Sequence, residues 1–174
     1  MDLNFKSNSK YLAEVAIIAS IYIILTISLG ALSFGINVPF FPIPIQLRIS
    51  EALLVLVLFR KSAPAGLVLG CFIANFWSPF LLPDMIFGTI GSALAVYGIY
   101  RLKNMNILIT LLPGVIFNAI LVALELKIFF NIPLISGIAV AVGQILVIYA
   151  LGIPLYYALK KIGFKNDYEN VLIN

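Results

Sequence analysis

The sequence predicts an all-α integral membrane protein, a bundle of six transmembrane helices with both termini in the cytoplasm. The composition, the succession of apolar segments and the placement of basic residues support this prediction. Of the 174 residues, 63% are hydrophobic and 10% are charged, whereas soluble domains are nearer half apolar and a quarter charged. Segments that cross a bilayer must satisfy their own backbone hydrogen bonds, so we expect these segments to be helices.

The apolar segments are separated by short stretches that carry proline or charge, such as 60–62, 101–106 and 131–133. The first segment is too long for the apolar core of a cleaved secretion signal, and further spans follow it. We therefore interpret it as the first helix of a single membrane domain over residues 1–174. The expected helices are roughly 11–32, 46–59, 63–78, 84–100, 107–126 and 134–159.

Basic residues determine the expected orientation. With the N-terminus in the cytoplasm, only Arg48 and Lys127 of the eleven lysines and arginines lie on the outer side. This is the positive-inside pattern of a multi-pass protein of the cell membrane. The basic residues on the cytoplasmic side are Lys6, Lys10, Arg60, Lys61, Arg101, Lys103, Lys160, Lys161 and Lys165.

The second and third segments are short for a membrane span. Between Pro44 and Arg60 the chain can extend roughly 22 Å as a helix, against a hydrocarbon core of about 30 Å. Short or proline-interrupted spans are typical of transporter binding sites, because irregular backbone at membrane depth must line a cavity. The alternative is that these helices simply thin the bilayer around them.

Polar side chains at membrane depth cost several kcal/mol on insertion scales and therefore indicate function. Such residues gather toward the outer half of the expected bundle, where we predict a substrate-binding site. The candidate residues are Arg48, Glu51, Asn75, Asp84, Asn118, Glu125 and Gln144.

Each candidate also has a structural interpretation. Arg48 and Glu51 are three residues apart, so a helix would place them on one face as an internal salt bridge. Glu125 lies two residues from Lys127, which suggests a solvated pair at the membrane interface. Asp84 begins the fourth segment, where a carboxylate suits a helix N-terminus as cap and dipole partner.

Three other features point to helix packing or to ligand stacking. Asn75 is suited either to joining helices or to binding ligand. Small residues recur at helical spacing in the first, third and fourth segments, where they permit close approach of helices. Aromatic residues 40, 76 and 77 are candidates to stack on a ligand ring, although aromatic residues are common at membrane interfaces. The small residues are Ala13, Ala16, Ala19 and Ser20; Gly66 and Gly70; and Gly88, Gly91, Ala95 and Gly98.

The sequence offers little for catalysis. It contains no histidine and a single cysteine, so zinc and haem sites and a histidine general base are not expected. It has no paired nucleophile and base, no phosphate-binding loop and no DNA-binding motif. We therefore expect no enzyme activity, no cofactor and no nucleic-acid partner. ATP-driven transport would require separate ATPase subunits.

Several stretches resemble the QueT family, the queuosine-precursor substrate-binding subunits (S components) of energy-coupling factor (ECF) transporters. Residues 45–53 (IQLRISEAL) resemble the family signature, and residues 71–80 (CFIANFWSPF) with 84–88 (DMIFG) resemble its second block. The similarity extends over most of the chain. The weaker blocks are 118–126 and 143–154.

This resemblance implies a six-helix membrane subunit that binds a 7-deazaguanine, preQ1 or preQ0, from outside. It further implies partnership with a transmembrane coupling protein and two cytoplasmic ATPases, within membrane lipid. Small residues of the first helix contact the coupling protein in this class, which here indicates Ala16 and Ser20. A guanine-like base offers N–H donors to carboxylates and an O6 acceptor to a donor. The expected acceptors are Glu51 and Glu125, and the expected donors are Arg48, Asn75, Asn118 and Gln144.

The sequence departs from the family pattern at Gln144, where the family has glutamate. One carboxylate fewer favours the neutral nitrile over the cationic aminomethyl ligand. Two other interpretations stay open: the same architecture with another ligand, such as a vitamin or a purine, and a membrane scaffold that binds only protein. The buried polar cluster argues against the scaffold, because a scaffold has no need to surround a cavity with Asn118 and Gln144.

Overall fold

The computed structural model describes residues 2–34 and 45–168, with side chains from residue 8 onward, and every regular element in these ranges is a helix. The predicted all-α class is therefore confirmed. The elements are α1 (Asp2–Ser28), α2 (Gly30–Ser33), the 3₁₀ helix η1 (Ile49–Leu58), α3 (Ala63–Ala74), the 3₁₀ turn η2 (Asn75–Trp77), α4 (Leu82–Arg101), α5 (Ile107–Phe130), α6 (Ser136–Val147), the π-helical η3 (Ile148–Gly152) and α7 (Ile153–Lys161).

Four of these helical stretches are long and apolar enough to cross a membrane. The elements α6, η3 and α7 form one of them, Ser136–Lys161, in which the π-helical turn lies just before Pro154. Two shorter apolar helices, Ile49–Leu58 and Ala63–Trp77, correspond to the segments predicted to be short. The four long stretches are Asn8–Ser28, Leu82–Arg101, Ile107–Phe130 and Ser136–Lys161.

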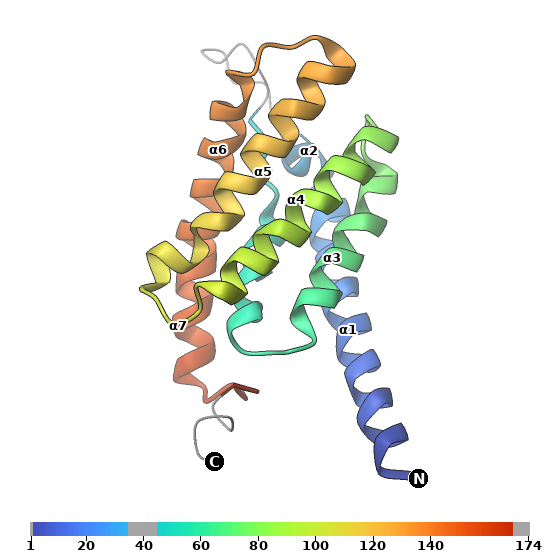
Figure 1. The fold of residues 1–174 in the computed structure, drawn as a ribbon, viewed down its shortest axis with the longest axis vertical. Helices are drawn as coiled ribbons and strands as arrows, with labels where there is room; N and C mark the ends of the chain where they lie inside the picture. The colour runs from blue at the N-terminus through green and yellow to red at the C-terminus, as the bar shows by residue number, and fades with distance from the viewer. Residues whose placement is uncertain (1, 35–44, 169–174) are drawn as a thin grey trace.

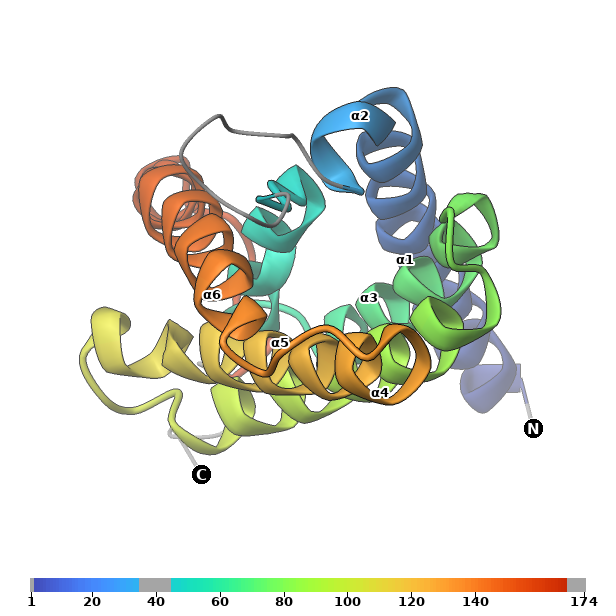
Figure 2. The same ribbon diagram turned by 90° about the horizontal axis from the view of Figure 1, so that it is seen from above.

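The helices form a ring when the molecule is viewed along its long axis (Figure 2). Each element contacts the next in the order α1, α3, α4, α5, α6 and η1, and η1 closes the ring against α1. The beginning of α1, the end of α7 and the turns that follow η1 and α4 lie toward one end of the bundle (Figure 1). The turns that follow α3 and α5 lie toward the other end.

Glycines allow the closest helix contacts. A Cβ added to Gly66 would lie 2.8 Å from Cβ of Ile18, and one added to Gly70 would lie 2.8 Å from Cβ of Tyr22. Both contacts are between α3 and α1, as the small-residue pattern predicted. On α4, a Cβ at Gly98 would lie 2.6 Å from Cβ of Pro113 in α5. Real Cβ atoms do not approach this closely, so these helix pairs depend on glycine.

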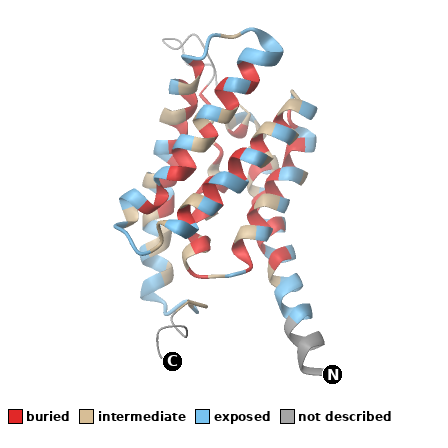
Figure 3. Cartoon of the chain, viewed as in Figure 1, coloured by how far each residue is buried: buried red, intermediate tan, exposed pale blue. Residues whose placement is uncertain are grey.

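The ring interior is apolar toward the end where η1 turns into α3. Leu54, Leu67, Ile99, Leu111 and Ile148 are buried there in one cluster. Buried residues line the inward faces of the helices, and exposed residues cover the outward faces (Figure 3). Many exposed residues are large and apolar, which suits an outer surface in contact with lipid.

The segment predicted as a helix over 46–59 differs from expectation in two respects. It becomes helical only at Ile49, and it then forms a 3₁₀ helix ten residues long, although such runs rarely exceed three or four residues. With three residues per turn, Glu51, Leu54 and Val57 lie on one face, and all three are buried. Arg48 is the N-cap residue, with non-helical backbone angles, so it is not part of the helix that contains Glu51.

Candidate functional site

All seven candidate residues lie in the interior of the ring, each at most 5% exposed. They come from the segment before η1 and from η1, η2, α4, α5 and α6, so nearly every side of the ring contributes a polar group. Contacts connect all of them except Gln144, which is buried on α6 without a hydrogen bond to the others. We call these residues, together with Tyr22, Cys71 and Ser78, the polar cluster.

Glu51 is held from two opposite sides of the ring. The Tyr22 hydroxyl of α1 donates to one carboxylate oxygen at 2.6 Å, and Nδ2 of Asn118 in α5 donates to the other at 3.3 Å. The hydroxyl oxygens of Thr26 and Ser50 lie 2.7 Å apart and form a second contact between α1 and η1. The carboxylate of Glu51 is therefore fixed in the middle of the bundle.

Arg48 does not form the predicted salt bridge with Glu51. Tyr22 and Asn118 donate to the carboxylate of Glu51 in place of Arg48. The ion pairs of the described residues lie elsewhere, around Arg60 and Asp167. Nη1 of Arg48 approaches Sγ of Cys71 at 3.8 Å, a weak contact. The guanidinium still interacts electrostatically with Glu51 and with Asp84.

Asn75 joins helices and also keeps a free acceptor. Its Nδ2 donates to the backbone oxygen of Asp84 at 2.8 Å, which ties the end of α3 to the start of α4. Its Oδ1 has no partner among the described residues. Gly88 makes room for this side chain, because a Cβ there would lie 2.7 Å from Nδ2 of Asn75 and 3.6 Å from Nη1 of Arg48.

Asp84 is not the cap of its helix. α4 begins at Leu82, its N-cap residue is Leu81, and no side chain caps this end. Asp84 lies in the first turn, where its charge still suits the helix dipole. The Ser78 hydroxyl donates to the Asp84 carboxylate across the turn between α3 and α4.

Glu125 is fully buried, so the predicted solvated pair with Lys127 is wrong. Lys127 instead donates to Oδ1 of Asn131 at 3.0 Å, at the end of α5. Neither carboxyl oxygen of Glu125 has a hydrogen-bond partner among the described residues other than the carboxyl group of Asp84. The Glu125 side chain interacts electrostatically with Asp84, which disfavours its negative charge, and with Arg48, which favours it.

Unpaired polar atoms collect in this region. Leaving a buried donor or acceptor unsatisfied costs about 1–3 kcal/mol, so the unpaired atoms indicate a place where a ligand or water would be stabilised. One is a donor and four are acceptors, which suits a ligand rich in N–H groups. In the polar cluster they are Nε of Arg48, Oδ1 of Asn75, both carboxylate oxygens of Glu125 and Oε1 of Gln144.

The sequence analysis did not identify Tyr22 as a site residue, although its spacing from Thr26 and its polar hydroxyl could have indicated it. Tyr22 and Thr26 are four residues apart in the first apolar segment and share one helix face. A tyrosine buried among apolar residues needs a hydrogen-bond partner for its hydroxyl. Trp77 and Phe76 are 58% and 49% exposed, so they do not line the polar cluster, and Phe40 lies outside the described residues.

Ala16 and Ser20 lie on the outer surface of α1. The neighbouring Ala19 is buried and faces Gly70 of α3. The small residues of α1 thus divide into an inward side that packs within the bundle and an outward side that is exposed.

In the part of the chain that the structure describes, no three acidic, cysteine or histidine residues are arranged to hold a metal ion.

An apolar helical bundle with a buried polar cluster is the architecture of a small-molecule membrane transporter. The family model described as QueT transporter matches residues 12–161, and the chain belongs to this family. The queuosine precursor transporter QueT of Lactococcus lactis subsp. cremoris (strain MG1363) is 38% identical over 85 residues, or 48% of this chain. The match spans 45% of that relative's length. No solved structure matches the chain.

Proposed function

We propose that this protein is the substrate-capturing subunit of an ECF-type importer and that it binds a 7-deazaguanine queuosine precursor in the polar cluster. The observation that carries the proposal is the set of buried, unpaired acceptors on Asn75, Glu125 and Gln144. Membership in a transporter family and the name of the Lactococcus relative support the substrate class.

The chemistry of the base fits the unpaired atoms. A 7-deazaguanine presents N–H donors on its pyrimidine and pyrrole rings and one carbonyl acceptor at O6. The oxygens of Glu125, whose neighbour is the carboxyl group of Asp84, can accept adjacent N–H groups of the base, whereas those of Glu51 already accept from Tyr22 and Asn118. Nε of Arg48 is the unpaired donor that suits O6. Glu51 then acts by holding Tyr22 and Asn118 in position around the ligand.

The neighbouring acidic groups Asp84 and Glu125 favour the cationic ligand preQ1. Their side chains lie close enough for a hydrogen bond between the two carboxyl groups, and such a pair holds a shared proton, because two like charges at this distance are not both stable. The aminomethyl cation of preQ1 would replace that proton as the positive partner of both groups. This arrangement outweighs the preference for the neutral nitrile that the glutamine at position 144 suggested.

We also propose six spans within one membrane domain. The four long helical stretches and the two short helices, Ile49–Leu58 and Ala63–Trp77, would each cross most of the bilayer. An even number of crossings agrees with the position of the beginning of α1 and the end of α7 at the same end of the bundle (Figure 1). The basic turns after η1 and α4 lie toward this end too, which makes it the cytoplasmic end by the positive-inside rule.

Transport would require a coupling protein and two ATPases. The sequence has no phosphate-binding loop, so the energy of ATP must come from other chains. The exposed small residues Ala16 and Ser20 on α1 offer a flat surface on which a helix of the coupling protein can pack closely.

A thermal-shift panel on the purified protein tests the ligand. The panel contains preQ1, preQ0, queuine, guanine, riboflavin and thiamine. Binding stabilises the folded state by RT ln(1 + [L]/Kd), about 2.7 kcal/mol at a hundredfold excess over Kd. We expect the largest rise in melting temperature with preQ1 and a smaller one with preQ0. A rise with riboflavin or thiamine and none with a deazaguanine would refute the proposed substrate class.

A further inference from the structure

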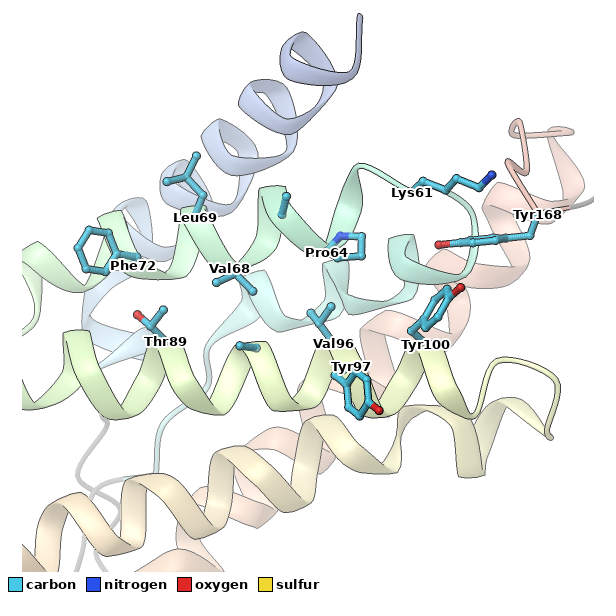
Figure 4. A pocket seen from close by; sticks show the side chains of 12 residues that line it. Lys61, Pro64, Val68, Leu69, Phe72, Thr89, Val96, Tyr97, Tyr100 and Tyr168 are labelled. Atoms are coloured by element: carbon cyan, nitrogen blue, oxygen red, sulfur yellow. The ribbon is translucent and has the colours of Figure 1, made fainter. Parts of the chain in front are cut away.

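A separate groove runs between α3 and α4 on the outside of the ring (Figure 4). Its volume is about 810 Å³, and its walls are almost entirely apolar. Leu69 and Phe72 of α3 line one end, and Tyr100 of α4 lines the other. None of the seven candidate substrate residues contributes to it, so this groove is distinct from the polar cluster.

One end of the groove is basic. Lys61 lies there beside Tyr168 and Tyr100 (Figure 4). The ammonium of Lys103 lies 4.3 Å from the ring centre of Tyr100 and 4.2 Å from that of Tyr168, which brings a second cation to the same end. Lys61 forms no side-chain ion pair within the described ranges.

The acidic groups described near this end already have partners. Asp167 pairs with Arg60 at 3.4 Å and with Lys165 at 3.9 Å, and it accepts from the backbone nitrogen of Lys61 at 3.1 Å. Glu14 pairs with Arg60 and accepts from the Ser62 hydroxyl at 2.9 Å. The side-chain ammonium of Lys61 therefore keeps its positive charge available at the mouth of the groove.

The length and the opening of the groove match one lipid leaflet. From Pro64 to Phe72 it follows α3 for roughly 12 Å, most of the 15 Å or so of hydrocarbon in half a bilayer. Leu69, Phe72 and Tyr97 on its rim are between 40% and 59% exposed, so the groove opens sideways, where membrane hydrocarbon would surround the bundle.

We propose that this groove binds an anionic phospholipid, with an acyl chain between α3 and α4 and the headgroup phosphate at Lys61. An occupant with one anionic end and a long apolar tail fits a groove with one cationic end and apolar walls. Basic pockets between transmembrane helices bind anionic headgroups in this way. An apolar helix of a partner protein would fill the walls but would leave Lys61 without a counter-charge.

Tyr168 suits the headgroup end in a second respect. Burial, with Tyr100 and Asp167 nearby, raises the pKa of Tyr168 to about 12. Like an unperturbed tyrosine hydroxyl, that of Tyr168 is protonated at physiological pH and can donate to a phosphate oxygen. The headgroup would then have a cation and a neutral donor on neighbouring elements.

Native mass spectrometry of the protein from nanodiscs made of equal parts dioleoylphosphatidylglycerol (DOPG) and dioleoylphosphatidylcholine (DOPC) tests the proposal. We expect the wild-type protein to retain DOPG at least fivefold over DOPC. Lys61→Gln should bring this ratio close to one, and Ala93→Trp, which fills the groove from α4, should remove the retained lipid. Lys127→Gln, which removes an exposed lysine far from the groove, is the matched control and should leave the ratio unchanged.

Three results would overturn the proposal. The first is an unchanged DOPG ratio in Lys61→Gln. The second is displacement of bound DOPG by soluble glycerol phosphate as effectively as by added DOPG, which would indicate a phosphate site that does not recognise the acyl chain. The third is retention of lipid by Ala93→Trp, or by Ala65→Leu if the tryptophan variant does not accumulate. This measurement of bound lipid needs no deazaguanine, so a failure of the lipid proposal can be distinguished from a failure of the proposed transport function.

Discussion

At the scale of single residues, the buried carboxylates have different environments and therefore different roles. Each oxygen of Glu51 accepts a hydrogen bond, from Tyr22 or from Asn118, whereas Glu125 has only the carboxyl group of Asp84 as a neighbouring partner. A satisfied carboxylate contributes to the shape of a site. An unsatisfied one costs stability until a ligand arrives.

Glu125→Gln should therefore separate binding from stability. The amide can donate to Asp84 without a shared proton, so the ligand-free protein should gain about 1–3 kcal/mol and melt at a higher temperature. Affinity for preQ1 should fall more than tenfold, at least about 1.4 kcal/mol, and affinity for the neutral preQ0 should fall less. Isothermal titration with both ligands, with differential scanning fluorimetry of the free protein, measures these changes. Equal losses for the two ligands would show that Glu125 does not bind the aminomethyl cation.

Glu51→Gln should weaken ligand binding more than tenfold, about 1.4 kcal/mol or more, while the protein still inserts and folds. The amide retains one acceptor oxygen, so only one of the donors Tyr22 and Asn118 keeps its bond. Tyr22→Phe is the companion variant, since it removes the hydroxyl but not the charge. Ligand titration and size-exclusion chromatography report the outcome, and wild-type affinity in Glu51→Gln would remove this residue from the site.

The sequence predicted these residues as a set but not their pairings. Burial of polar groups follows from their cost in lipid, which holds for all seven candidates. The pairing of Arg48 with Glu51 assumed a helix that includes both residues, whereas η1 begins at Ile49. The pairing of Glu125 with Lys127 assumed an interfacial position, which depends on where α5 ends in space and not on local sequence.

At the scale of elements, the positions of the helices were predictable, including those of the two short ones, but the 3₁₀ form of η1 was not. The predicted 84–100 and 107–126 lie within the observed α4 and α5, which extend slightly further. The 3₁₀ form of η1 could not be predicted, because a short segment that is almost wholly apolar shows no periodicity that separates three residues per turn from 3.6. The neighbours of η1 select its form, among them α1 and η3.

Gly88 is where element packing and the site meet. A methyl group there would contact Nδ2 of Asn75 at 2.7 Å, where it donates to the backbone of Asp84. Gly88→Ala should therefore destabilise the protein by about 1–3 kcal/mol through overpacking and should weaken ligand binding by displacing Asn75. Thermal unfolding and ligand titration measure the two effects.

Gly30→Ala provides the control for this substitution. A Cβ at Gly30 would meet no atom of the described residues closer than 3.8 Å, so this variant should keep both stability and affinity. If Gly88→Ala behaved like Gly30→Ala, the close contact with Asn75 would not be needed for the site.

At the scale of the whole molecule, the partners that we propose would use separate surfaces of the ring. The interior carries the polar cluster, the outer side of α1 carries exposed small residues, and the groove between α3 and α4 opens at the outer surface of the bundle. Because Gly66 and Gly70 of α3 pack on the inward side of α1, a bulky residue on the outward side need not disturb the interior. Binding and coupling should therefore be separable by mutation.

Ala16→Trp tests this separation. The indole would project from the outer surface of α1, away from Tyr22 and the polar cluster, so the affinity for preQ1 should stay within about twofold of wild type, or ~0.4 kcal/mol. Uptake of preQ1 in a strain that also expresses the coupling protein and ATPases should fall to background, because close helix packing tolerates no large side chain. Ile120→Trp places the same side chain on an exposed position of α5 and should leave uptake intact. Normal uptake in Ala16→Trp would exclude the outer face of α1 as the coupling surface, and a loss of uptake in both variants would point to a general effect of tryptophan on the membrane bundle.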